Sequence, residues 1–165
     1  MNDDDILEAI IVREGGEAIT DDASDFGGRT RYGISERAHP EAWRNGPPSK
    51  EQAKKIYTRT YLLPFAPLVN IGIDERVREA LIDDAVLSGP KTAIRSLQNV
   101  LGVPADGVIG PRTLEAALKA NIEGHWLLTR LVQDRALRLA RLVQQRPNQL
   151  RYLVGWLSRC LSFLG

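Results

Sequence analysis

Cysteine and histidine are scarce in this sequence of 165 residues, which has one cysteine and two histidines. A single cysteine excludes an internal disulfide and a cysteine-based metal site. His39 and His125 lie far apart and lack the spacing of zinc ligands, so we expect neither a metal nor another cofactor. Cys160 lies in an apolar run near the C-terminus, where a small buried side chain is expected.

Long apolar runs are absent as well. No stretch approaches the roughly 18 apolar residues that a membrane-spanning helix needs, so we expect no membrane span. The opening residues, MNDDDILEAI, are acidic and lack the basic segment and long apolar run of a secretory signal peptide. If the substrate lies outside the cytoplasm, another component must deliver the protein.

A strong net charge is also absent, since the formal value is +1, but the two halves differ. Residues 1–89 contain 11 basic and 17 acidic groups, whereas residues 90–165 contain 11 basic and 4 acidic groups. A basic half suits a polyanionic partner. The sequence has no short run rich in lysine and arginine and no recognised DNA-binding motif, so we expect no nucleic-acid partner.

Glu14 is the first candidate functional residue. Leu7, Ile10 and Ile11 fall on one helical face, and Glu14 continues their spacing just before Gly15–Gly16 ends the helix. Apolar surroundings at a helix end favour the protonated carboxyl group that a general acid needs. The alternative is a glutamate in a frayed last turn that points to solvent.

An acidic, turn-rich segment follows this helix. Its turn-forming residues are Asp21, Asp22, Ser24, Asp25, Gly27 and Gly28. The aspartates can serve turn and cap chemistry alone, and we favour this interpretation for Asp21 and Asp22. The next residues, 29–32, alternate and include threonine and tyrosine, which predicts a short ribbon of two or three β-strands.

The remaining chain is predicted to be helical, with an irregular link at residues 63–67. The expected helices span 35 or 36 to about 40, 49–61, 75–88, 90–101, 111–119, 121–145 and 148–164. In the last helix, most apolar side chains, including Leu150, Val154 and Leu161, are expected to be buried. The fold class is therefore mainly α, with helices packed on helices and one small β ribbon.

Asp84 is a second carboxylate on an apolar helical face. Its neighbours at helical spacing are Val77, Ala80, Leu81 and Ser88. A functional carboxylate is one interpretation, and a buried aspartate satisfied by backbone or arginine is the other.

The stretch Glu14–Ser35 resembles the signature of the glycoside hydrolase family 108 N-acetylmuramidases. The matching residues read Glu-Gly-Gly at 14–16, Asp-Phe-Gly-Gly at 25–28, Arg-Thr at 29–30 and Arg-Tyr-Gly-Ile-Ser at 31–35. The resemblance implies a lysozyme-like helical fold with the β ribbon at the active-site cleft. It also implies cleavage of the β-1,4 bond between N-acetylmuramic acid and N-acetylglucosamine in peptidoglycan.

The second half resembles the peptidoglycan-binding region that accompanies this family. The matching motifs are residues 96–98, 101–103, 106–110, 113–114 and the closing 155–159. We therefore expect a muramidase lobe at 1–89 and a helical peptidoglycan-binding lobe at 90–165, packed as one globular unit because no linker separates them. The implied partner is the peptidoglycan glycan strand, and a monomer is expected.

The resemblance also implies where the protein acts. Many relatives are phage endolysins, and others assist secretion across the bacterial wall. We expect synthesis in the bacterial cytoplasm, delivery by a holin or a secretion system, and action at the periplasm and cell wall.

The resemblance assigns roles to individual residues. Glu14 matches the essential glutamate, and Asp25 and Thr30 match the aspartate and threonine of a Glu, Asp, Thr triad. Because the loop is longer than in many relatives, Asp22 remains an alternative to Asp25. Tyr32 is a candidate to contact the sugar or to support the site, and so is Asp84.

Two other functions remain open. A lytic transglycosylase would also use one glutamate but would close a 1,6-anhydro ring. A non-catalytic wall-binding or secretion accessory protein is favoured by the motif at 106–110, and by Glu17, which stands where the family usually has an aromatic residue.

Overall fold

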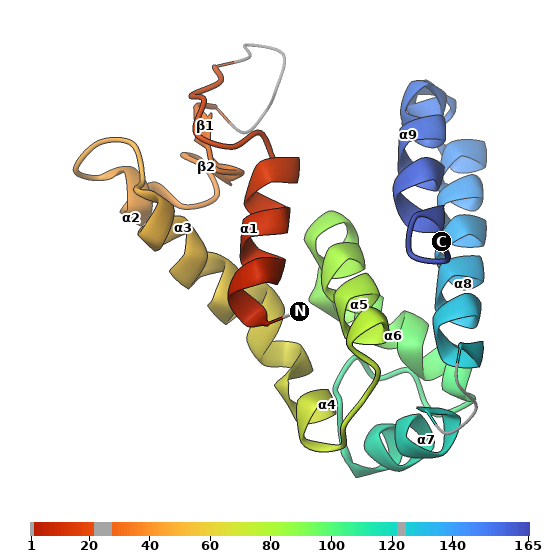
Figure 1. Ribbon diagram of the computed structural model, residues 1–165. Helices are drawn as coiled ribbons and strands as arrows, with labels where there is room; N and C mark the ends of the chain where they lie inside the picture. Colours follow the sequence, from red (N-terminus) through yellow and green to blue (C-terminus); the bar gives the residue numbers. More distant parts are fainter. Residues whose placement is uncertain (1, 22–27, 122–124) are drawn as a thin grey trace. The chain divides into compact units, whose positions relative to one another are not determined.

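The computed structural model describes residues 2–21, 28–121 and 125–165 (Figure 1). It is mainly helical and has one small antiparallel sheet, as the sequence predicted. The chain forms two compact units, Met1–Leu63 and Pro64–Gly165. This boundary differs from the one between the predicted lobes, which lies at residue 89. The division into a muramidase lobe and a peptidoglycan-binding lobe stays a prediction.

The first unit combines three helices with a β hairpin in its described part. Its elements are α1 (Asp3–Arg13), β1 (Thr30–Arg31), β2 (Ile34–Ser35), α2 (Pro40–Trp43), α3 (Lys50–Tyr57) and a π-helical turn (Thr58–Leu62). The two strands pair Thr30 with Ser35 and Arg31 with Ile34. Buried aliphatic side chains of α1, Ile6, Leu7, Ile10 and Ile11, form much of the core of this unit.

Local sequence signals explain most boundaries in this unit. Ser49 and Gln52 form the predicted capping box at the start of α3. The predicted helix from residue 35 or 36 to about 40 is wrong, because the helix begins at Pro40 rather than ending there. Proline fits the first turn of a helix and disfavours helical conformation in the residue before it.

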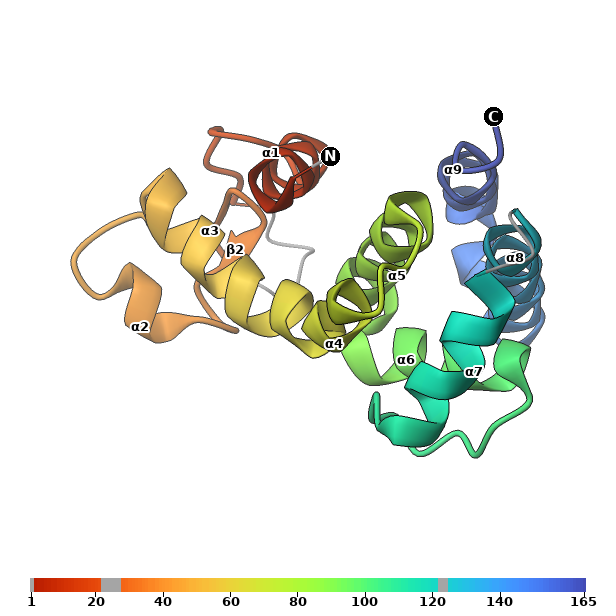
Figure 2. The same cartoon turned by 60° about the horizontal axis from the view of Figure 1, so that its bottom comes forward.

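The second unit is a set of packed helices. A 3-10 turn (Leu63–Phe65) leads into α4 (Ala66–Asn70), α5 (Glu75–Ser88), α6 (Pro90–Leu101), α7 (Pro111–Asn121), α8 (Trp126–Gln145), a 3-10 turn (Pro147–Gln149) and α9 (Leu150–Leu161). Helices α5, α6 and α8 pack on one another, and α9 packs on α8 (Figure 2). Asp74 caps α5, and Gly102 ends α6 in the left-handed conformation.

Three expectations for the second unit are wrong. Residues 63–67 are helical, and the long helix begins at Trp126. The last helix is also less buried than predicted, since Leu150 is 61% exposed, Val154 76% and Leu161 52%. Among the described residues α9 packs mainly on α8 and the turn before it, so its remaining apolar positions lie at the surface. Cys160, as predicted, is fully buried.

The described residues lack two kinds of feature. None of the helices in this part of the chain combines the length and the apolarity needed to cross a bilayer. The same residues contain no group of three or more histidine, cysteine or acidic side chains that could hold a metal ion.

Candidate active site

The tip of the β hairpin is a two-residue turn made by Tyr32 and Gly33. Both residues have positive φ, 52° and 75°, as a type I′ hairpin turn requires. Glycine adopts this conformation freely, whereas a residue with a Cβ is strained by about 1–2 kcal/mol. The surrounding contacts must therefore hold Tyr32 in place.

Three contacts hold Tyr32. Its N–H donates to the carbonyl of Gly16 at 3.0 Å, and its own carbonyl accepts a hydrogen bond from the Tyr57 hydroxyl at 3.1 Å. The Arg31 guanidinium lies 5.0 Å from the centre of its ring. Because Tyr32 is only 8% exposed, it supports the hairpin from within. Its contact with a sugar stays a prediction.

Glu14 lies at the end of α1, against this hairpin tip. Its N–H still donates to the carbonyl of Ile10 at 2.9 Å, and its side chain is half-buried. A Cβ added to Gly33 would lie 2.7 Å from Glu14 Cβ and 3.3 Å from Glu14 Cγ. Glycine at position 33 therefore permits both the turn and the close approach of the glutamate stem.

Two tyrosines lie near Glu14. Tyr57 ends α3, and the π-helical turn that follows sets the Tyr61 ring 5.6 Å from the Tyr57 ring, between centroids. The Tyr57 hydroxyl would also collide with a methyl group on Gly33. Burial, and after it the negative charge of Glu14, raises the pKa of Tyr61, so its hydroxyl keeps its proton near neutrality. Single π-helical turns are frequent at functional sites.

Ion pairs fix the base of the hairpin. Arg29 binds Glu36 through two hydrogen bonds of 2.8 and 2.9 Å. Arg31 donates to the Glu17 carbonyl at 3.1 Å and to the Glu17 carboxylate at 3.2 Å. Glu17, where the resemblance led us to expect an aromatic residue, thus contributes to hairpin position through Arg31.

Of the other two predicted catalytic residues, the structure describes Thr30 but not Asp25. Thr30 lies in β1, half-buried, and its hydroxyl donates to the Gly28 carbonyl at 3.4 Å. Thr30 begins the strand that leads to the Tyr32–Gly33 turn, and this turn contacts Glu14. Asp25 and its alternative, Asp22, lie outside the described residues.

Asp84 has a different environment, in α5 of the second unit. It is 4% exposed, and the Ser88 hydroxyl donates to it at 3.0 Å. The ion pairs of this cluster are Arg135–Asp83, Arg135–Asp84, Arg138–Asp84 and Arg159–Asp83. A buried aspartate satisfied by arginine, one of the two interpretations of the sequence, is what the structure shows. A contact between Asp84 and a sugar stays a prediction.

The two tyrosines near Glu14 lie outside the motif that predicted the site. A weaker signal was present, since Tyr57 falls on the inner face of its predicted helix and Tyr61 follows four residues later. Residues at this spacing lie on the same side of a helix. That spacing indicates a pair of neighbouring rings, but it does not indicate that they lie beside Glu14.

Both halves of the chain match known protein families. The family model described as glycosyl hydrolase 108 matches residues 7–89, and one described as a predicted peptidoglycan domain matches residues 92–161. The solved structure of Brucella abortus SagA is similar, with 29% sequence identity and a TM-score of 0.68. The similarity covers 98% of this chain and 94% of that chain. A search of curated protein sequences found no match.

Proposed function

The chain belongs to the glycosyl hydrolase 108 family, and on that premise we propose that it is an N-acetylmuramidase. The bond cleaved is the β-1,4 linkage between N-acetylmuramic acid and N-acetylglucosamine in peptidoglycan. The position of Glu14 carries the proposal. It is a half-buried carboxyl group that lies against a strained hairpin tip and near a raised-pKa tyrosine, inside the matched region.

Glu14 is the proton donor in this proposal. Its carboxyl group protonates the glycosidic oxygen as the bond to the sugar breaks, the step for which glycosidases use a general acid. Gly33 lets the hairpin approach the glutamate stem, and the Tyr57 hydroxyl fixes the tip through the Tyr32 carbonyl. A positioned side chain loses little freedom when the substrate binds, which favours the reaction.

Asp25 and Thr30 complete the proposed chemistry. Asp25 stabilises the developing oxocarbenium charge or orients the attacking water, and Thr30 helps to hold that water. The strand position of Thr30, next to the turn that contacts Glu14, supports its role. We further propose that the protein acts at the periplasm and cell wall after delivery by a holin or a secretion system.

The chemistry of the products tests this function. Purified wall sacculi are digested, the new ends are reduced with borohydride, and the fragments are identified by mass spectrometry. A muramidase yields fragments that end in reduced N-acetylmuramic acid. The Glu14→Gln protein at the same concentration is the control.

Other products would contradict the proposal. Ends in 1,6-anhydro-muramic acid, which lack one water, identify a lytic transglycosylase. Ends in reduced N-acetylglucosamine identify cleavage of the other linkage. Binding to sacculi without any released fragment identifies a non-catalytic wall-binding protein.

A further inference from the structure

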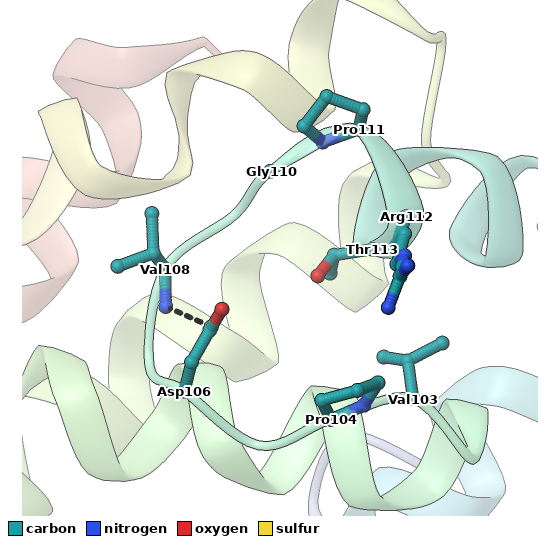
Figure 3. A pocket seen from close by; sticks show the side chains of 8 residues that line it. All are labelled: Val103, Pro104, Asp106, Val108, Gly110, Pro111, Arg112 and Thr113. Carbon is teal, nitrogen blue, oxygen red and sulfur yellow. Dashed lines mark hydrogen bonds between the residues drawn. The ribbon is translucent and has the colours of Figure 1, made fainter.

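A second candidate site lies in the second unit, beside the loop between α6 and α7. Figure 3 shows a pocket bounded by this loop and the first turn of α7. Its volume is about 350 Å³, at the lower end of the range for small-molecule sites. The pocket therefore suits a short segment of a polymer rather than a whole repeating unit.

The loop around this pocket is held from inside by Gln98. This residue of α6 is 1% exposed. Its amide nitrogen donates to the Asp106 carboxylate at 2.7 Å and to the Val108 carbonyl at 2.9 Å, and its oxygen accepts from the Gly107 N–H at 2.8 Å. A loop fixed in this way forms its pocket before a ligand arrives, which reduces the entropy lost on binding.

Charges of opposite sign stand on two sides of the pocket. Asp106 lies on the loop, and Arg112 lies in the first turn of α7 across the pocket from it (Figure 3). The hydrogen bond from Gln98, followed by that from the Val108 N–H, holds the pKa of Asp106 below its usual range, so it remains ionised. A carboxylate accepts up to about four hydrogen bonds, which leaves Asp106 capacity for a ligand.

Thr113 adds a hydroxyl group to the floor of the pocket. It is 3% exposed, and its oxygen accepts a hydrogen bond from Gln98 at 3.2 Å. A hydroxyl group that accepts in this way still has its own hydrogen to donate. Together with Arg112 and the N-terminus of α7, it favours an anionic group on this side.

We propose that this pocket binds the peptide stem of peptidoglycan, at a residue that carries both an amine and a carboxylate. The carboxylate binds Arg112 and Thr113, and the amine binds Asp106. Val103, Pro104 and Val108 provide apolar walls for the carbon chain between the two groups. The inference rests on the proposed action on peptidoglycan and adds which part of the polymer the second unit recognises.

The lining favours the peptide over the glycan strand. The N-acetylated sugars of the strand carry no positive charge, so they offer no cationic partner for Asp106. No aromatic side chain lines the pocket among the described residues, so it has no flat surface on which a sugar ring could stack. A simple polyanion would be repelled by Asp106.

Calorimetric titration of the full chain with a synthetic stem tripeptide, L-alanyl-D-glutamyl-diaminopimelate, tests the proposal. We expect binding by the wild-type protein, and affinity about tenfold to a hundredfold lower for Arg112→Gln and for Asp106→Asn. Arg130→Gln, an exposed arginine on α8 away from this pocket, is the matched control and should bind as the wild type does. Thermal unfolding verifies that each variant folds.

Amidation of the ligand sharpens the test. If Arg112 binds the diaminopimelate carboxylates, amidating them should weaken binding to the wild type and leave Arg112→Gln unaffected. The proposal is overturned if the wild type does not bind the tripeptide, or if Arg112→Gln and Arg130→Gln bind it equally. It is also overturned if chitotetraose binds in place of the peptide and Arg112→Gln abolishes that binding. Because the tripeptide has no glycosidic bond, none of these results depends on hydrolysis.

Discussion

The end of α1 and the middle of α5 show the same sequence pattern with different outcomes. Each places a carboxylate in register with the apolar face of a helix. At the end of α1, Glu14 is half-buried among a glycine turn and two tyrosines. In α5, Asp84 is 4% exposed and paired with two arginines of α8.

This difference shows that a carboxylate on the apolar face of a helix does not by its position alone indicate a catalytic role. A carboxylate on an apolar face loses contact with water, and pairing with cations offsets that cost. The arginines around Asp84 pair with its carboxylate and connect α5 to α8, which suits packing. The described residues beside Glu14 include the hairpin tip and two tyrosines, and Glu14 is the proposed proton donor.

The largest expected effect is on catalysis at the end of α1. Glu14→Gln keeps the shape and removes the acid, so hydrolysis of purified peptidoglycan should fall by about 10²–10⁴-fold with the fold retained. Turbidity clearing measures the rate, and circular dichroism checks the fold. Glu51→Gln, a change of an exposed glutamate in the first turn of α3, is the control and should remain active. A Glu14→Gln protein that clears walls at the wild-type rate would remove Glu14 from the mechanism.

In α5 the corresponding change should affect stability instead. Asp84→Asn leaves the buried Arg135 and the half-buried Arg138 with less negative charge, so the free energy of unfolding should fall by about 3–5 kcal/mol. Urea unfolding measures this change. Glu115→Gln, which disrupts an exposed pair with Lys119, should cost less than about 1 kcal/mol. Equal urea midpoints for the two variants would mean that the arginine cluster does not stabilise the unit.

Gly33→Ala tests the contact between the hairpin and Glu14. The added methyl group would collide with the Tyr57 hydroxyl and with the stem of Glu14, so it should cost about 1–3 kcal/mol more than the backbone strain alone. Gly28→Ala is the matched control, because its φ of 69° is similar to 75° at Gly33 and no atom of the described residues lies within 4 Å of its Cβ position. If Gly33→Ala and Gly28→Ala lower the free energy of unfolding in urea by the same amount, the clash at position 33 has no energetic cost.

The smallest effect concerns the pH dependence of stability. Because burial and the charge of Glu14 raise the pKa of Tyr61 in the folded state, the unfolded state loses this proton first as pH rises. Stability should therefore be fully present below the ordinary tyrosine range and fall as pH rises through it. Tyr61→Phe should flatten this alkaline decline in urea unfolding. An unchanged slope would show that Tyr61 does not contribute.

Local patterns predicted most elements of the fold. The capping box at Ser49, the cap at Asp74 and the boundaries of α6 depend on residues a few positions apart, so the sequence reveals them directly. The helix expected before Pro40 is wrong for a local reason, because proline begins a helix at this position instead of ending one. Burial of α9 failed because it depends on which neighbouring element covers each face.

The sequence by itself determined the motif from Glu14 to Ser35, the mainly helical class and the hairpin. Only the tertiary structure decided what surrounds each carboxylate. Tyr57 and Tyr61 reach Glu14 from another helix, and Arg138 reaches Asp84 from 54 positions away. Helical periodicity is a short-range property that indicates which side chains turn inward. Their partners are selected by packing between distant segments, which spacing along the chain does not encode.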